Sequence, residues 1–226
     1  MSTAVVIGAD RGIAHEIARQ LHERGDTVIA ACVTGNDALV AAGVTVEGGV
    51  DVTSQDAVDK FAAKLGEQGV TIDALYHVAG VMWLDELGSI DYDRFTKQFE
   101  INTIGPLRTV EALRDLLGAG SKVGIVTSRV GSLVDNSSGG MYSYRISKAA
   151  ANMVALNLHH DLAKRGISVL ALHPGMVATD LTKDFPGDHA YIQPDQAAAG
   201  LIANIDALTA ETSGKFQHSN GQFLDW

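Results

Sequence analysis

The chain of 226 residues is 46% hydrophobic and 19% charged, and its formal net charge is -10 at pH 7. This length and composition suit a globular protein with a sizeable core. The acidic balance argues against nucleic acid or an anionic membrane as partner, and the chain has no run of about 18 apolar residues that would predict a membrane span.

The first elements predict a phosphate-binding turn. Thr3 to Ile7 is typical of a short buried strand, and it is followed by the turn from Gly8 to Ala14 (GADRGIA) and a helix expected over 12–24. Free amides and the positive dipole end of such a helix hold a pyrophosphate without a basic side chain. The turn lacks the Gly-Lys-Ser/Thr ending of a nucleoside triphosphatase, so a dinucleotide is the expected ligand.

The second expected strand, 27–32, ends at Cys32, the only cysteine of the chain. A single cysteine excludes an internal disulfide, and the first residues show neither the basic start nor the apolar core of a signal peptide. We therefore expect a cytoplasmic protein.

Strand-like and helix-like segments alternate through the rest of the chain. Further strands are expected over 45–50, 72–78, 122–127 and 167–173, and further helices over 54–66, 92–99, 103–117, 142–165 and 194–208. This alternation predicts an α/β fold with a doubly wound parallel sheet (the Rossmann fold), in three α/β/α layers. No linker interrupts it, so residues 1–226 are expected to form a single domain.

Tyr144 and Lys148 lie four positions apart in the helix expected over 142–165 and therefore on the same face. A neighbouring cation in a partly dry cleft favours the phenolate, so the pair suits general acid/base chemistry. The alternative is an amphipathic helix that places the ring on the core and the amine in water.

Other polar and glycine residues follow expected strands, where ligands bind in sheets of this kind. They are the turn from Gly8, Asp51, Ala79-Gly80, Ser128 and Pro174-Gly175. Together with Val52, Asn102, Tyr144, Lys148 and the segment 174–179 (PGMVAT), they resemble the short-chain dehydrogenase/reductase family over nearly the whole chain. The segments 131–144 and 214–226 are further similar to the short C-factor and sniffer-like carbonyl reductases.

The resemblance implies an oxidoreductase that transfers hydride between a nicotinamide cofactor and a carbonyl or secondary alcohol. Tyr144 would donate or remove the proton, and Lys148 would lower the phenol pKa and bind the nicotinamide ribose. Ser128 would hold the substrate oxygen, with Ser132 as a less favoured substitute. Asn102 would hold a water of the proton relay, or mark a helical kink before Gly105-Pro106.

The implied cofactor site comprises Gly8, Asp10, Arg11, Gly12, Ile13, Thr34, Asp51, Val52, Ala79, Gly80, Tyr144, Lys148, Pro174, Gly175, Val177 and Thr179. NADP(H) is favoured over NAD because no acid ends the second strand, and because Arg11 and Thr34 suit a 2'-phosphate, although Asp10 would repel it.

Three positions depart from the family pattern. Ile7 stands where Thr is usual, and Ala14 stands where a third glycine is usual. His77 stands in place of an amide that braces the sheet, and we interpret it as structural rather than catalytic.

No metal site is predicted, because the eight histidines and one cysteine have no ligand spacing and the segment 15–19 (HEIAR) fails the metalloprotease pattern. His159 and His160 are expected to be solvated. Apolar residues expected to shape a substrate pocket are Met82, Trp83, Leu133, Met141, Met176 and the segment 181–192.

Two other functions remain open at this stage. One is a signalling or regulatory protein that binds nicotinamide nucleotide with little turnover. The other is a nucleotide-sugar epimerase or dehydratase, which usually needs a larger carboxyl-terminal domain. A homodimer or homotetramer is expected through the helices over 103–117 and 142–165.

Overall fold

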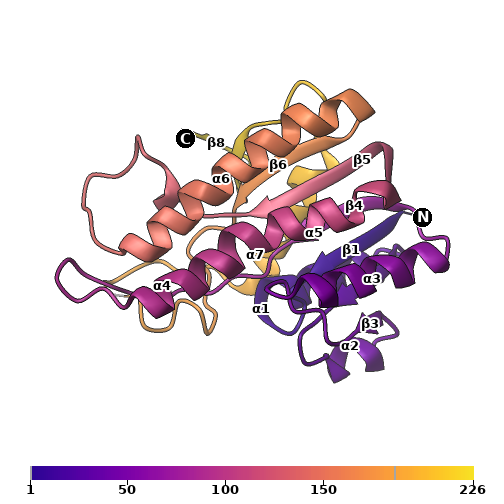
Figure 1. Cartoon of the computed structure of the whole chain (residues 1–226), viewed down its shortest axis with the longest axis horizontal. Helices are drawn as coiled ribbons and strands as arrows, with labels where there is room; N and C mark the ends of the chain where they lie inside the picture. Colours follow the sequence, from indigo (N-terminus) through magenta and orange to yellow (C-terminus); the bar gives the residue numbers. More distant parts are fainter. Residues whose placement is uncertain (1, 186) are drawn as a thin grey trace.

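The strands form one sheet in the order β3-β2-β1-β4-β5-β6-β7-β8, in which only β8 is antiparallel to its neighbour (Figure 1). The structure is a computed structural model and describes residues 2–185 and 187–226. The strands are β1 (Thr3–Ile7), β2 (Thr27–Ala31), β3 (Thr45–Glu47), β4 (Ile72–His77), β5 (Leu117–Val126), β6 (Ser168–His173), β7 (Phe216–His218) and β8 (Phe223–Leu224).

Helices connect the parallel strands. They are α1 (Gly12–Glu23), α2 (Asp37–Ala41), α3 (Gln55–Glu67), α4 (Tyr92–Phe99), α5 (Gly105–Leu113), α6 (Tyr142–Leu162) and α7 (Pro194–Asp206). Short 3-10 turns cover Arg114–Leu116, Arg129–Gly131 and Ala163–Arg165, and a π-helix covers Glu100–Ile104. The predicted doubly wound α/β fold is therefore confirmed.

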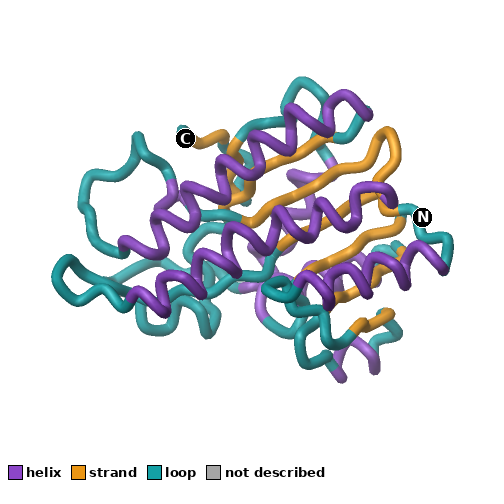
Figure 2. The backbone as a smooth tube through the Cα atoms, viewed as in Figure 1, coloured by secondary structure: helices purple, strands orange, loops and turns teal. Residues whose placement is uncertain are grey.

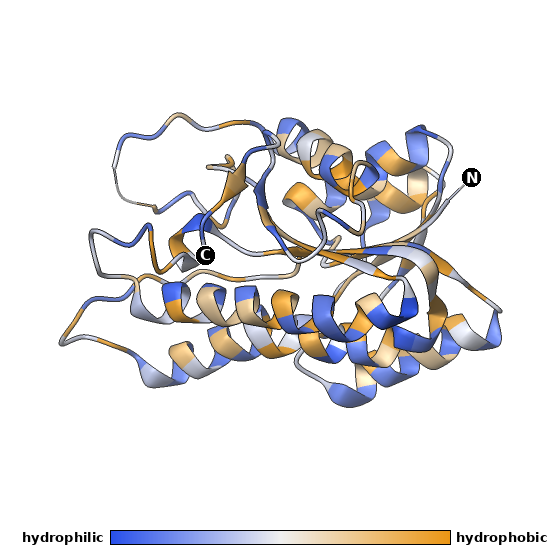
Figure 3. Ribbon diagram, turned by 90° about the horizontal axis from the view of Figure 1, so that it is seen from above, coloured by the Kyte–Doolittle hydropathy of each residue, from blue (hydrophilic) through white to orange (hydrophobic). Residues whose placement is uncertain are grey.

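Two cores lie on opposite faces of the sheet because successive strand side chains alternate between faces. On one face, Val6 of β1 lies in the cluster that α1 and α7 cover. On the other face, Val5 and Ile7 lie in the cluster that α3, α5 and α6 cover. Figure 3 shows the helices on both sides of the sheet.

Several elements differ from the sequence expectations. The helix expected over 103–117 ends earlier, and β5 begins at Leu117, five residues before the predicted strand. The irregular register of β5 against β4 between Ile72 and Ala74 accompanies this early, glycine-containing part of the strand. The elements α2, β7 and β8 were not predicted, because each is short and depends on distant partners.

The β5 arrow in Figure 1 points toward one end of the molecule, and Figure 2, in the same view, shows loops gathered at that end. The strand order reverses between β1 and β4, which are parallel neighbours in the sheet, because β2 and β3 follow on one side of β1 and β4 to β7 on the other. Ligands of doubly wound folds bind at such a point. Within the described residues, no helix has the length and hydropathy to cross a membrane. Cys32 is buried and unpaired, and its burial raises the pKa of its thiol to about 12.

Candidate active site

A cleft of about 330 Å³ lies at the carboxyl edge of the sheet and contains much of the predicted site. It is bordered by residues that follow β4, β5 and β6 and by one face of α6, so segments distant in sequence meet there. The predicted site residues that line it are Ile13, Gly80, Ser128, Tyr144, Lys148, Pro174, Gly175, Val177 and Thr179.

The other predicted site residues lie outside the lining of this cleft. They are Gly8, Asp10, Arg11, Gly12, Thr34, Asp51, Val52, Ala79 and Asn102. Asp51 accepts hydrogen bonds from the amide (2.9 Å) and hydroxyl (2.8 Å) of Thr53, and Val52 is buried against Gly105. These contacts lie in the loop between β3 and α3 and pack it against the start of α5.

The glycine turn has the backbone that its sequence predicts. Gly8 and Gly12 adopt φ of 86° and 62°, which side-chain-bearing residues rarely reach. A Cβ on Gly8 would lie 2.7 Å from Ala79 Cα, so the turn and the segment after β4 are in close contact. Ala14, which replaces the usual third glycine, is buried in the core beneath α1.

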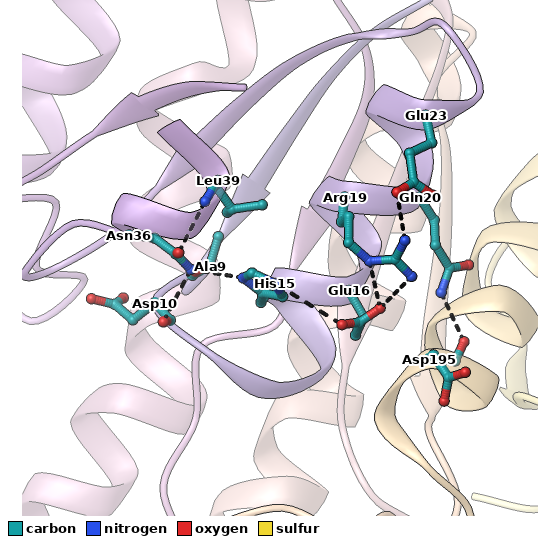
Figure 4. Close-up of polar contacts among 10 residues, drawn as sticks. All are labelled: Ala9, Asp10, His15, Glu16, Arg19, Gln20, Glu23, Asn36, Leu39 and Asp195. Atoms are coloured by element: carbon teal, nitrogen blue, oxygen red, sulfur yellow. Dashed lines mark hydrogen bonds and ion pairs between the residues drawn. The ribbon is translucent and has the colours of Figure 1, made fainter. Parts of the chain in front are cut away.

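Asn36 holds this turn from outside, a contact that the sequence did not indicate (Figure 4). Its Nδ2 donates to the carbonyl of Ala9 at 2.8 Å and of Asp10 at 3.1 Å, and it lies 2.9 Å from His15 Nδ1. Its Oδ1 accepts from the Leu39 amide and thereby caps α2. One side chain thus joins α2 to the turn at the start of α1.

Tyr144 and Lys148 are both buried on the face of α6 toward the cleft. Lys148 Nζ donates to the Val126 carbonyl at 3.1 Å and lies 5.8 Å from the centroid of the Tyr144 ring. Burial lowers the pKa of Lys148 to about 8. The alternative in which the amine reaches water is therefore wrong.

The pKa of Tyr144 is raised to about 12, because burial opposes the phenolate more strongly than the hydrogen bond with Ser128 favours it. The predicted lowering by Lys148 is therefore wrong for the protein alone. The phenol is protonated at neutral pH and is ready to donate.

Ser128 and Ser132 make different contacts. Ser128 lines the cleft and acts on the pKa of Tyr144, whereas the Ser132 hydroxyl accepts from the Asp135 amide at 3.2 Å. Ser132 thus has a part in folding its own loop, and the catalytic role of Ser128 stays a prediction.

Two buried amides fix α6 through neighbouring serines. Gln98 accepts from the Trp83 amide at 2.6 Å and donates to Ser143 Oγ at 2.7 Å. Asn102 exchanges two hydrogen bonds of 2.9 Å with the backbone of Val81 and donates to Ser147 Oγ at 3.1 Å. Ser143 immediately precedes Tyr144, and Ser147 immediately precedes Lys148. These hydrogen bonds therefore fix the position of the Tyr144 and Lys148 pair.

Asn102 lies in the π-helix Glu100–Ile104, which confirms the predicted irregularity before Gly105. Gln98 was missed because a buried glutamine gives no periodic signal. The amino end of α6 has another unforeseen contact, since the Ser143 amide donates to Asp85 at 3.0 Å.

The histidines have mainly structural surroundings. His77 is buried, its Nε2 has no hydrogen-bond partner among the described residues, and burial lowers its pKa to about 3. His159 is partly buried and lies 2.7 Å from Ser213 Oγ, so the expectation of full solvation is wrong. His173, which was not predicted, lines the cleft.

The predicted apolar pocket is only partly correct. Met82, Met176 and, from the segment 181–192, Leu181 and Phe185 line the cleft. Trp83, Leu133 and Met141 do not, and Leu133 is 80% exposed. Pro186 lies outside the described residues. No cluster of three or more His, Cys, Asp or Glu side chains able to hold a metal occurs in the part of the chain that is described.

The cleft fits a nicotinamide nucleotide. It extends from Ile13 beside the glycine turn to Lys148, and Gly80 lies between them. A Cβ on Gly80 would come within 3.2 Å of Asn102 Oδ1 and 3.5 Å of Lys148 Nζ, so a side chain there would crowd the inner end. A cleft lined both by a residue beside the glycine turn and by a buried amine suits a dinucleotide bound across the switch point of the sheet.

The fold and site together define a class, the dinucleotide-dependent oxidoreductases. The family model of the short chain dehydrogenases matches residues 2–189. The chain belongs to this family and is an oxidoreductase, as the sequence predicted.

Two relatives are similar over much of the chain. A 1-hydroxy-2-glutathionyl-2-methyl-3-butene dehydrogenase of Rhodococcus sp. (strain AD45) is 72% identical over 226 residues, 100% of both chains. The C-signal of Myxococcus xanthus is 40% identical over 159 residues, 69% of this chain and 93% of its own.

Two solved structures have the same fold. The NADPH-bound carbonyl reductase from chicken fatty liver has a TM-score of 0.91 at 25% identity and covers 100% of this chain and 99% of its own. A short-chain dehydrogenase/reductase from Burkholderia multivorans with bound NADP has a TM-score of 0.88 at 28% identity, with the same coverage. The predicted similarity to C-factor-like and carbonyl reductases is confirmed.

Proposed function

We propose that this protein transfers a hydride between NADP(H) and an alcohol and its carbonyl form, on a substrate that carries a glutathionyl group. The observation that carries the reaction is that Ser128, the protonated phenol of Tyr144 and the buried Lys148 line one cleft. The observation that carries the substrate is the identity of 72% with the Rhodococcus dehydrogenase over the whole chain.

In this mechanism Ser128 and Tyr144 hold the substrate oxygen between two hydroxyl groups. During carbonyl reduction, Tyr144 donates its proton to that oxygen as negative charge develops there, and Ser128 stabilises the same charge. Alcohol oxidation is the reverse step, in which Tyr144 first releases its proton to solvent and its phenolate then accepts the proton of the alcohol. The bound nicotinamide supplies or accepts the hydride.

Lys148 would hold the nicotinamide ribose and place a positive charge behind the developing phenolate. Gly80, Val177 and Thr179 would border the nicotinamide end, and the glycine turn would receive the pyrophosphate. Asn102 and Gln98 act through α6 as positioning residues, because their side chains bind backbone and serine hydroxyls.

NADP(H) is supported by the chicken and Burkholderia structures and by the absence of an acid at the end of β2. Arg11 is free to meet a 2'-phosphate, because its ion pair with Asp180 (3.5 Å) is exposed and such pairs are weak. Asp10 opposes this choice. Its carboxylate accepts from the Val33 amide at 3.0 Å and from the Thr34 amide and hydroxyl at 2.9 Å.

Asp10→Asn is therefore expected to lower the KM for NADPH about three- to tenfold and to leave the KM for NADH nearly unchanged, because one negative charge near the 2'-phosphate is removed. Steady-state kinetics with both nucleotides measure this effect. Asp37→Asn, an exposed change of the same charge on α2, is the matched control. A higher KM for NADPH in Asp10→Asn would contradict our assignment of the 2'-phosphate to this region.

The proposed reaction is tested by nicotinamide oxidation and reduction assays over glutathionyl alcohols, simple alcohols, aldehydes, ketones and quinones. We expect the protein to oxidise the alcohol with oxidised nucleotide and to reduce the carbonyl form with reduced nucleotide. Tight nucleotide binding without turnover of any of these substrates would favour the signalling alternative, to which the C-signal match lends support. Retention of Ser128, Tyr144 and Lys148 in one cleft supports the enzyme.

We further propose that residues 1–226 form a single domain and that two copies of the protein form a dimer through the outer faces of α5 and α6. Exposed apolar side chains on these helices support this, namely Leu107, Ile146 and Met153. Light scattering is expected to give at least twice the 23.8 kDa chain mass, and a constant monomer mass across concentrations would contradict the dimer.

The buried, unpaired Cys32 supports a cytoplasmic location, which recovery of the protein in a secreted fraction would refute.

A further inference from the structure

Two arginines stand beside the catalytic pair at the rim of the cleft. Arg129 directly follows Ser128, Arg145 directly follows Tyr144, and both side chains line the cleft. With Lys148 they make three cations among the described lining residues, against one carboxylate, Asp135. In a chain of net charge -10, this is a local reversal of charge.

Arg145 forms no ion pair with a carboxylate among the described residues, although its charge, after the hydrogen bond from Arg129, helps to lower the pKa of Asp135. Its Nη1 donates to the Val130 carbonyl at 3.1 Å and its Nη2 to Ser138 Oγ at 2.9 Å, while its Nε is buried without a hydrogen-bond partner. A buried guanidinium N–H left unpaired costs free energy that an anionic ligand would recover.

Arg129 has one partner, which is exchangeable. It pairs with Asp135 through Nε and through Nη2 at 3.3 Å, and both side chains are about half exposed. An ion pair so exposed is weak, so a carboxylate arriving in the cleft can compete for Arg129. Burial lowers the pKa values of His173, which lines the cleft, and of His218, and the charge of Arg129 adds to both shifts.

We propose that Arg145 and Arg129 form a carboxylate-binding site that selects the substrate by its glutathionyl group. Glutathione carries two carboxylates at neutral pH, and planar guanidinium groups match carboxylates by paired, charge-assisted hydrogen bonds. Because both arginines adjoin catalytic residues, this site would place a carboxylate of the conjugate while its hydroxyl meets Ser128 and Tyr144. This assignment rests on the proposed function.

The test compares S-(2-hydroxyethyl)glutathione with 2-(methylthio)ethanol, which has the same reacting alcohol and sulfur but no carboxylate. Arg145→Gln and Arg129→Gln are each expected to raise the KM for the conjugate about tenfold and to change kcat/KM for the small alcohol by less than about twofold. Arg145→Lys should recover part of the loss, and Asp135→Asn should lower the KM for the conjugate by freeing Arg129. Equal losses on both alcohols would overturn the proposal.

A binding measurement separates this proposal from the proposed reaction. Calorimetry of the nucleotide-bound protein with S-methylglutathione is expected to give about tenfold weaker binding for its dimethyl ester and for Arg145→Gln. If no alcohol is turned over but this difference remains, the reaction is wrong and the carboxylate site stands. If the acid and the ester bind alike, the carboxylate site is wrong whatever the turnover.

Discussion

Tyr144→Phe is expected to lower kcat about a thousandfold, because it removes the proton donor and leaves the rest of the cleft in place. The ring is buried, and phenylalanine fills nearly the same space, so the KM for the nucleotide and the free energy of unfolding should change little. Steady-state kinetics and urea unfolding of the same preparations measure these quantities.

Tyr142→Phe is the matched control. Tyr142 lies on the same helix two positions away and does not line the cleft, so the same loss of a hydroxyl should leave kcat within about twofold of wild type. Full turnover by Tyr144→Phe would remove the general-acid assignment even though the family membership would stand.

Lys148→Met is expected to lower kcat/KM about a thousandfold and to leave the protein at least as stable as wild type at pH 7. Lys148 as a residue is 4% exposed, and among the described residues its ammonium donates one hydrogen bond, to the Val126 carbonyl. Burial of a charge with so little compensation costs stability, and methionine of similar length avoids that cost.

The difference in the free energy of unfolding between Lys148→Met and wild type should change with pH in a defined direction. The pKa of Lys148 falls from 10.5 in the unfolded chain to about 8 in the folded protein. Between these values the unfolded chain holds more protons, so this group makes wild type more stable as pH rises from 8 toward 10. The stability advantage of Lys148→Met, about 1–3 kcal/mol at pH 7, should therefore shrink over that interval.

Urea unfolding of the nucleotide-free proteins at several pH values measures the difference. Lys60→Met, on the exposed face of α3, is the control and should show no such trend. If Lys148→Met is less stable than wild type at pH 7, and if the difference in the free energy of unfolding does not depend on pH, then Lys148 stabilises the fold and our account of its burial is wrong.

The sequence predicted most of the parallel sheet because each central strand carries its own signal. Buried runs such as Thr3–Ile7 and Ile72–His77 need no knowledge of their neighbours to be identified. The small elements α2, β7 and β8 have no such signal, since α2 depends on the Asn36 cap and the other two on pairing with β6 and with each other.

The sequence likewise indicated some residues of the candidate site and not others. Helical spacing placed Tyr144 and Lys148 on one face, the family resemblance singled out Ser128, and all three line one cleft in the structure. Gln98 and Asn36 were not indicated, because their importance arises only when distant backbone groups come within hydrogen-bond reach. The direction of the Tyr144 pKa shift was wrong because spacing cannot report burial, and burial outweighs the neighbouring groups here.

Hydride transfer itself is tested most directly by deuterium tracing. The alcohol S-(2-hydroxyethyl)glutathione, labelled with deuterium on the carbon that bears the hydroxyl, is incubated with the protein and oxidised nucleotide, and the nicotinamide product is analysed by mass spectrometry. We predict that deuterium appears on the reduced nicotinamide with wild type and with Tyr142→Phe, and is nearly absent with Tyr144→Phe over the same time. Oxidation of the alcohol with the deuterium released to solvent, or no oxidation despite saturated nucleotide binding, would contradict the account.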